Sequence, residues 1–224
     1  MWVKKGKGGI IMATYIIIAI IAYLIGSINF SVIISRKMAG FDLREKGSGN
    51  AGTTNVLRTV GKKAALITLI CDILKGVVAI FVAYIAGKII KDVDTAMLAQ
   101  IAGLLVVVGH AFPIFFEFKG GKGVATSLGV ILTTNWQIGL ICLIFALVII
   151  IATQMVSMGS IGAAILFPIL TLFIDEHFII PASGMKYFIY SLLLALLVIF
   201  LHRENIKRIM NGNENKLSFK KEKN

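Results

Sequence analysis

Glycines, small polar side chains and an arginine share one short segment of this sequence, residues 46–58 (KGSGNAGTTNVLR). Glycines let the backbone approach a ligand closely, and an arginine provides a planar fork that suits a phosphate group. This composition is typical of an anion-binding loop before a helix N-terminus, although a flexible polar loop at a membrane surface would look the same. The candidate functional residues of this first polar segment are Ser48, Asn50, Gly52, Thr54, Asn55 and Arg58.

A second polar segment, residues 109–127, contains KGGKG at 119–123, directly before a short apolar run. Backbone N–H groups at a helix start attract anions, and the two lysines would add their charge. The alternative is a tight turn whose lysines extend to the membrane surface. A lone histidine near the end of a span is more often structural than catalytic. The candidates of this segment are His110, Lys119, Gly120, Gly121, Lys122 and Gly123.

A third polar segment, residues 202–208 (HRENIKR), follows the last apolar run. His202 and Asn205 are three residues apart and would share one helix face. We expect Glu204 to pair with Arg203, with Lys207 or with a cation of another segment. A cluster that only ends the last span is the alternative.

Asp72 and Lys75 lie inside the apolar run 64–86. Charges within a membrane span are costly and are usually functional or paired. Their separation by three residues places them on one helical face, so we expect a structural ion pair.

The composition excludes a soluble domain. Hydrophobic residues make up 58% of the 224 positions, charged residues only 15%, and the mean hydropathy is +0.90. A soluble protein has about 25% charged residues, and disorder requires low hydrophobicity. We therefore expect an all-α, polytopic integral membrane bundle. The net charge of +12 fits cytoplasmic lysines and arginines better than nucleic acid.

Seven apolar runs predict about seven transmembrane helices, at 13–34, 64–86, 97–118, 124–134, 136–153, 155–174 and 187–201. The fourth run would be roughly 16 Å long as a helix, which is shorter than the ~30 Å hydrocarbon core. We expect a short or broken helix there that begins at a recessed loop. Irregular backbone at that depth must be buried in protein or face water, which indicates a site near residues 120–123.

Seven spans with the N-terminus outside put most of the 23 lysines and arginines, the three polar segments and the C-terminus in the cytoplasm. Lys4, Lys5 and Lys7 oppose that rule, and we interpret residues 1–12 as an extension from a misassigned start. Residues 13–210 then form one membrane domain, and residues 211–224 a basic cytoplasmic tail. Two distant cysteines and no Cys/His cluster predict no disulfide framework and no metal.

These motifs resemble those of the bacterial acyl-phosphate:glycerol-3-phosphate acyltransferases of the PlsY type. The resemblance covers nearly all of residues 12–210, with no departure at the motif positions. It rests on GSI at 26–28, SGNAGTTN at 48–55 with Arg58, DILKG at 72–76, GH at 109–110, FP at 112–113, FKGGKGVAT at 118–126 and residues 202–208.

The resemblance implies transfer of an acyl group from acyl phosphate to the sn-1 hydroxyl of glycerol 3-phosphate, in the bacterial cell membrane and without a cofactor. It implies that Ser48 and Arg58 are needed for activity and hold a phosphate. It also implies that the 120–123 glycines, with Lys119 or Lys122, bind glycerol phosphate, that His202 and Asn205 are active residues, and that Glu204 is a structural acid. Because acyl phosphate is labile, a functional link to an enzyme that makes it is implied.

Two questions stay open at this level. The base that assists the attacking hydroxyl is either His202, if its pKa is near neutral, or the phosphate of the donor, which we favour slightly. The main alternative function is transport of an anionic solute, since transporters also use broken helices with glycine-rich ends. Paired interruptions in two halves of the chain would favour transport, and the sequence has none.

Overall fold

The computed structural model describes residues 2–174 and 184–217, and their side chains from residue 8 onward. These residues contain helices and no strand, which confirms the all-α prediction. The α-helices are α1 (Trp2–Gly26), α2 (Phe30–Ala39), α3 (Thr53–Thr59), α4 (Lys62–Ile89), α5 (Thr95–Ala111), α6 (Val124–Thr134), α7 (Trp136–Thr153), α8 (Val156–Leu170), α9 (Gly184–Leu201) and α10 (Arg203–Met210). Two 3₁₀ turns, Leu43–Glu45 and Ile114–Phe116, lie in the connections.

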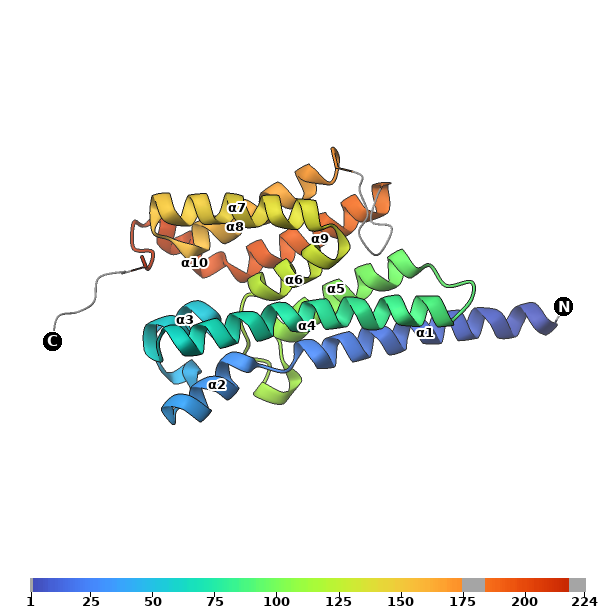
Figure 1. Cartoon of the computed structure of the whole chain (residues 1–224), viewed down its shortest axis with the longest axis horizontal. Helices are drawn as coiled ribbons and strands as arrows, with labels where there is room; N and C mark the ends of the chain where they lie inside the picture. The colour runs from blue at the N-terminus through green and yellow to red at the C-terminus, as the bar shows by residue number, and fades with distance from the viewer. Residues whose placement is uncertain (1, 175–183, 218–224) are drawn as a thin grey trace.

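The helices form two groups with α6 between them (Figure 1). Helices α1, α4 and α5 pack together on one side, and α7, α8 and α9 on the other. Helix α6 contacts both α4 and α7. Helix α1 begins at one end of the bundle, and α10 lies toward the opposite end.

Five segments of the described chain are long and apolar enough to cross a membrane, with α1 and α2 counted together from Gly8 to Ala39. Helices α6 and α8 are apolar but shorter. The bounds of α6 and α7 agree with the fourth and fifth predicted spans. The predicted short fourth span is therefore a real helix, and it begins directly after the KGGKG sequence at 119–123.

Three predicted runs do not form one helix over their whole extent. The first run is divided between α1 and α2, because Asn29 starts a new helix by accepting the Val32 N–H with its side chain at 3.3 Å. In the third run, α5 ends at Ala111, since Pro113 disfavours helix in the residue before it, although the apolar segment continues to Phe116. The sixth predicted span extends to residue 174, whereas α8 ends at Leu170.

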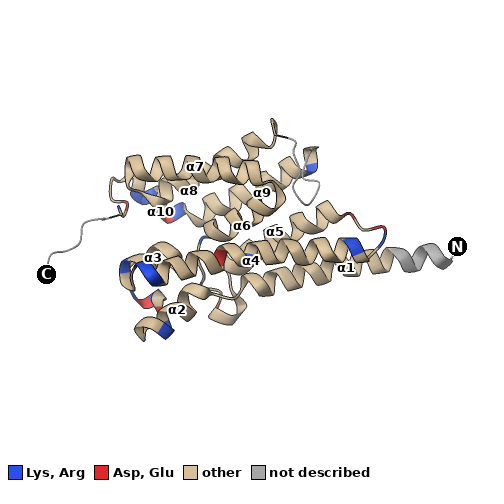
Figure 2. Cartoon of the chain, viewed as in Figure 1, with Lys and Arg blue, Asp and Glu red and all other residues tan. Residues whose placement is uncertain are grey.

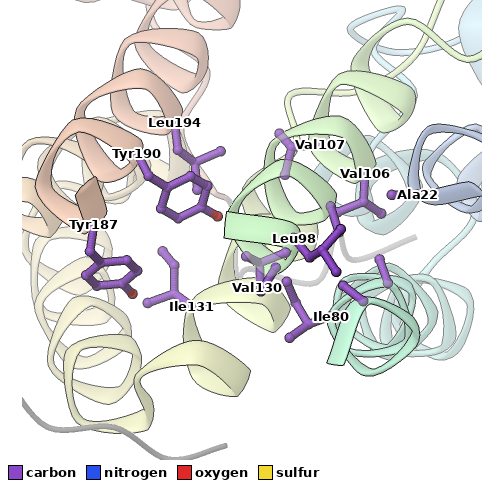
Figure 3. Packing of buried hydrophobic residues seen from close by; sticks show 14 of the residues in the cluster. Ala22, Ile80, Leu98, Val106, Val107, Val130, Ile131, Tyr187, Tyr190 and Leu194 are labelled. Atoms are coloured by element: carbon purple, nitrogen blue, oxygen red, sulfur yellow. The ribbon is translucent and has the colours of Figure 1, made fainter. Parts of the chain in front are cut away.

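Close backbone contacts fix α6 in the centre of the molecule. A Cβ atom on Gly76 of α4 would lie only 2.4 Å from the Thr126 carbonyl oxygen, and one on Gly129 only 2.1 Å from that of Ile73. Small residues that let helix backbones approach are the usual contacts between membrane helices. Figure 3 shows Val130 and Ile131 of α6 among core residues from α4, α5 and α9. This packing fixes the start of α6 and the loop before it.

Candidate active site

The three polar segments line one cavity of about 770 Å³. It lies toward the end of the bundle where α3 and α10 are found (Figure 1). The predicted site residues that contribute to its lining are Ser48, Asn50, Gly52, Thr54, Asn55, Arg58, Asp72, His110, Gly120, Gly121, Lys122, Gly123, His202, Glu204 and Asn205. Two predicted residues, Lys75 and Lys119, lie outside that lining.

In the first polar segment, Asn55 holds the loop in shape. Its side-chain amide nitrogen lies 3.0–3.2 Å from the carbonyl oxygens of Leu43, Lys46 and Asn50, and its Oδ1 accepts the Ser48 N–H at 3.0 Å. Gly47 has a φ of +61° and packs so close to Asn55 that a Cβ would be 2.2 Å from its Oδ1. The polar groups of Asn55 are thus engaged within the loop, while the exposed Ser48 and Arg58 remain at the cavity.

The second polar segment uses its glycines differently from our expectation. The N–H groups of Gly120 and Gly121 donate to the carbonyl oxygens of Ala111 and His110, both at 3.1 Å, so they are not available to an anion. A Cβ on Gly121 would lie 2.3 Å from His110 Nε2 and 2.6 Å from the Ala51 carbonyl oxygen. These glycines are therefore needed where the loop packs against α5 and the first segment.

The two lysines of this loop have different surroundings. The Lys119 side chain is 73% exposed and pairs with Glu117 at 3.5 Å. Lys122 is partly buried, lines the cavity and donates a hydrogen bond from Nζ to Asn205 Oδ1. Of the two lysines left open by the sequence, Lys122 is the one at the cavity.

In the third polar segment, the helix is interrupted at His202, which lies between α9 and α10. His202 and Asn205 are nonetheless both buried and both line the cavity. His202 Nδ1 lies 2.7 Å from the Val198 carbonyl oxygen. Because a carbonyl can only accept, we assign the proton to Nδ1 and leave Nε2 as the acceptor.

An acid that the sequence analysis missed, Glu214, organises this end of the cavity. Its carboxylate accepts hydrogen bonds from Ser157 Oγ at 2.8 Å, Asn205 Nδ2 at 2.7 Å and Arg208 Nε at 2.9 Å. Burial raises the pKa of Glu214, but these three donors outweigh burial and lower it. Because the Asn205 amide nitrogen is held by Glu214, its oxygen faces Lys122.

Glu204 is exposed, and among the described residues it forms none of the ion pairs we expected with Arg203, Lys207 or another segment. The buried acid at this end of the cavity is Glu214 instead. The signal in the sequence was weak: Glu214 is one of two acids in a mostly basic tail, and only folding brings it back to α10 and α8. The tail residues 218–224 lie outside the described residues.

Four cations from the three polar segments line the cavity: Arg58, Lys122, Arg203 and Arg208. Figure 2 shows basic residues on α3 and α10 at this end of the bundle. Burial, together with the neighbouring Arg208 and Arg58, lowers the pKa of Lys122 to about 8 against the opposing effect of Glu214. Burial also lowers the pKa of Arg58. These shifts show cations held together at a cost that a bound anion would relieve.

His202 is neutral at physiological pH. Burial lowers its pKa to about 4, with a further contribution from Lys122. The condition we set for a histidine base, a pKa near neutral, is therefore not met in the free protein.

Arg44, also missed, joins the first two polar segments. It pairs with Asp42 at 2.8 Å and donates to the Phe116 carbonyl oxygen at 2.9 Å. The hydrogen bonds from Arg44 hold the pKa of Asp42 well below its usual range. Arg44, which Asp42 orients just before the first polar segment, thus links that segment to the second through its hydrogen bond to Phe116.

An apolar pocket between α6, α7, α8 and α9 adjoins the cavity. The two share the lining residues Val124, Leu128, Leu143, Ala146 and Ser160. The pocket continues past Cys142 to Phe167 and Leu194. A polar compartment and an apolar one therefore meet, as an amphipathic substrate with a charged head and a hydrocarbon chain requires.

Apolar spanning helices and a cation-lined cavity define an integral membrane protein built to bind phosphate-bearing, amphipathic molecules. Comparisons with known proteins support this class and specify it. The glycerol-3-phosphate acyltransferase family model matches residues 16–212. A glycerol-3-phosphate acyltransferase of Clostridioides difficile is 44% identical over 93% of this chain and 98% of its own length. One of a Thermoanaerobacter species is 45% identical over 92% and 98%.

Solved structures agree. A crystal structure of PlsY (YgiH), an integral membrane glycerol 3-phosphate acyltransferase, in its glycerol 3-phosphate form has a TM-score of 0.79 and 37% identity, covering 91% of this chain and 96% of that one. The lysophosphatidic acid form of PlsY has a TM-score of 0.77 and 34% identity. The chain belongs to the glycerol-3-phosphate acyltransferase family, a family of membrane acyltransferases in lipid biosynthesis.

Proposed function

We propose that this protein transfers an acyl group from acyl phosphate to the sn-1 hydroxyl of glycerol 3-phosphate. The products are lysophosphatidic acid and inorganic phosphate, and the reaction is the first acylation of phospholipid synthesis. The observation that carries the proposal is the single cavity in which Arg58, Lys122 and Arg208 gather beside an apolar pocket. Both substrates carry a phosphate, and the donor also carries a hydrocarbon chain.

The chemistry needs alignment more than it needs a strong nucleophile. Acyl phosphate is a mixed anhydride with a good leaving group, so the hydroxyl oxygen can attack the carbonyl carbon directly. The protein must hold the two reactants in line. It must also stabilise the oxyanion and the departing phosphate, which the cavity cations and the Ser48 hydroxyl are suited to do.

The pKa of His202 favours the donor phosphate as the base that removes the hydroxyl proton. A group with a pKa of about 4 is a weak base at neutral pH. In this mechanism, His202 Nε2 orients a substrate hydroxyl by accepting its hydrogen bond. Asn205, held by Glu214, keeps Lys122 directed at the phosphate.

The proposal includes the orientation of the protein in the bacterial cell membrane. Seven helices cross the bilayer with the N-terminus outside and the C-terminus in the cytoplasm. Cations around α2, α3 and α10 gather at the end of the bundle that carries the cavity (Figure 2), and cytoplasmic surfaces are enriched in such cations. The cavity then faces the cytoplasm, where glycerol 3-phosphate and an enzyme that supplies the labile acyl phosphate would be found.

A direct assay tests the proposal. Purified protein in detergent receives labelled glycerol 3-phosphate with either acyl phosphate or acyl-CoA, in the presence and absence of EDTA. We expect lysophosphatidic acid and phosphate from acyl phosphate alone, with no effect of EDTA, because no cofactor or metal takes part. Arg58→Ala should remove the activity, and Lys63→Ala, at an exposed cation of α4, should retain it.

The remaining outcomes separate the alternatives. Product from acyl-CoA would show that the proposed donor is wrong, while glycerol 3-phosphate would remain the acceptor. Folded protein without product from either donor would reject acyl transfer and favour transport of an anion, which uptake of labelled glycerol 3-phosphate into liposomes would then measure.

A further inference from the structure

The ring of His110 is held along one edge by groups from two other helices. His110 lies near the end of α5 and is buried. Its Nδ1 is 3.3 Å from Thr126 Oγ1 of α6 and 3.6 Å from Asp72 Oδ1 of α4. A carboxylate beside Nδ1 favours the tautomer with the proton on that nitrogen, which leaves Nε2 as a hydrogen-bond acceptor.

Lys75 in turn holds Asp72. Its ammonium group lies 3.0 Å from Asp72 Oδ1 and donates to the carbonyl oxygens of Gly26 and Ile28, both at 3.1 Å. The predicted ion pair is therefore confirmed, but it does more than neutralise two charges. It connects the break between α1 and α2 to the ring of His110.

The other edge of the ring faces Gly121 of the second polar segment, which also lines the cavity. His110 contributes to the lining, and its Nε2 lies against Gly121 so closely that a Cβ there would be 2.3 Å away. Gly121 also contacts the carbonyl of Ala51 in the first polar segment. His110 Nε2 is thus placed where the two glycine-rich segments meet. Thr126, by contrast, is fully buried and outside the cavity lining.

We propose that Thr126, together with the Asp72–Lys75 pair, is a positioning residue that holds His110 so that Nε2 accepts a hydrogen bond from a hydroxyl of bound glycerol 3-phosphate. This inference rests on the proposed function, because it concerns the acceptor substrate of that reaction. Thr126 acts only through His110, since it does not reach the cavity. Its contribution should appear in the affinity for glycerol 3-phosphate and not in that for acyl phosphate.

The test replaces the Thr126 hydroxyl with a methyl group in the full-length protein. In Thr126→Val, we expect the KM for glycerol 3-phosphate to rise about fivefold, as for the loss of one hydrogen bond, with an unchanged KM for acyl phosphate. Thr126→Ser keeps the hydroxyl and should restore the KM. Thr133→Val is the matched control, because Thr133 is also buried on α6 but bonds only the Gly129 carbonyl of its own helix.

A binding measurement separates this inference from the proposed function. Glycerol 3-phosphate should raise the melting temperature of the wild type and of Thr133→Val more than that of Thr126→Val, with no acyl donor present. Equal behaviour of the two valine variants would overturn the inference, as would parallel changes in both KM values of Thr126→Val. Absence of acyl transfer by the wild type would instead reject the proposed function.

Discussion

Two groups of charged side chains lie at this cavity, and they differ in how their charges are balanced. Asp72 and Lys75 form one buried pair, with side chains 2% and 3% exposed. Arg58 and Lys122 form no ion pair with a carboxylate of the described residues, and Glu214 is paired with Arg208. Burial of balanced charge can be stable without a ligand. Excess positive charge is stabilised by an anion, so we propose that the second group binds phosphate.

The largest effect is expected from a substitution that breaks the buried Asp72–Lys75 pair. Asp72→Asn leaves the Lys75 ammonium buried without its carboxylate, which should lower the free energy of unfolding by about 3–5 kcal/mol. Asp72→Asn combined with Lys75→Met removes both charges and should recover part of that loss. Thermal unfolding in detergent measures both variants. Equal stability of the single variant and the wild type would mean that the pair contributes nothing to folding.

The next largest effect is expected when a cation is removed from the second group, which contains Arg58 and Lys122. Arg58→Ala should lower kcat/KM about 100- to 1,000-fold, the range seen when one group that stabilises transition-state charge is lost. Its melting temperature should change little, because the side chain is exposed and its one hydrogen bond to a described residue is to the Asn215 carbonyl at 3.3 Å. Arg58→Lys should recover only part of the activity, since an ammonium lacks the planar fork. Steady-state kinetics on the purified variants measures these changes in kcat/KM.

Substitutions of Lys122 and Lys119, two lysines of one loop, test this comparison further. Lys122→Ala should raise the KM for glycerol 3-phosphate about 30-fold, as expected when a charged hydrogen-bonding group is removed from a phosphate. Lys119→Ala should stay within about twofold, because exposed ion pairs contribute little. Similar effects of the two substitutions would argue against Lys122 as the phosphate ligand.

The smallest expected effect is the change of the KM for glycerol 3-phosphate with pH. Lys122 has a pKa of about 8, so its charge is present below that pH and is lost above it. Between pH 7 and pH 9 the KM for glycerol 3-phosphate should rise about tenfold, since the phosphate is already a dianion with a second pKa of about 6. His202 stays neutral throughout this range. The profile should be flat in Lys122→Ala, and a rise that persists in this variant would assign the titration to another group.

Much of the architecture was predictable because its signals are local. Runs of apolar residues predicted α6 and α7 to the residue, and the break between α1 and α2 was missed because hydropathy does not change at Asn29. The three polar segments were recognised because glycine and small polar residues stand out against apolar helices. Their shared cavity followed from topology, since loops on one side of a bundle can meet.

The sequence by itself determined that the chain is a helical membrane protein with three polar segments between or after its apolar runs and a charged pair within a span. Only the tertiary structure decided that Lys122 faces the cavity and Lys119 does not, that Glu214 and not Glu204 holds Asn205, and that Thr126 contacts His110. Composition and hydropathy depend on each residue alone. Contacts between residues far apart in sequence depend on how helices pack, and that is set by close approaches such as Gly76 against Thr126.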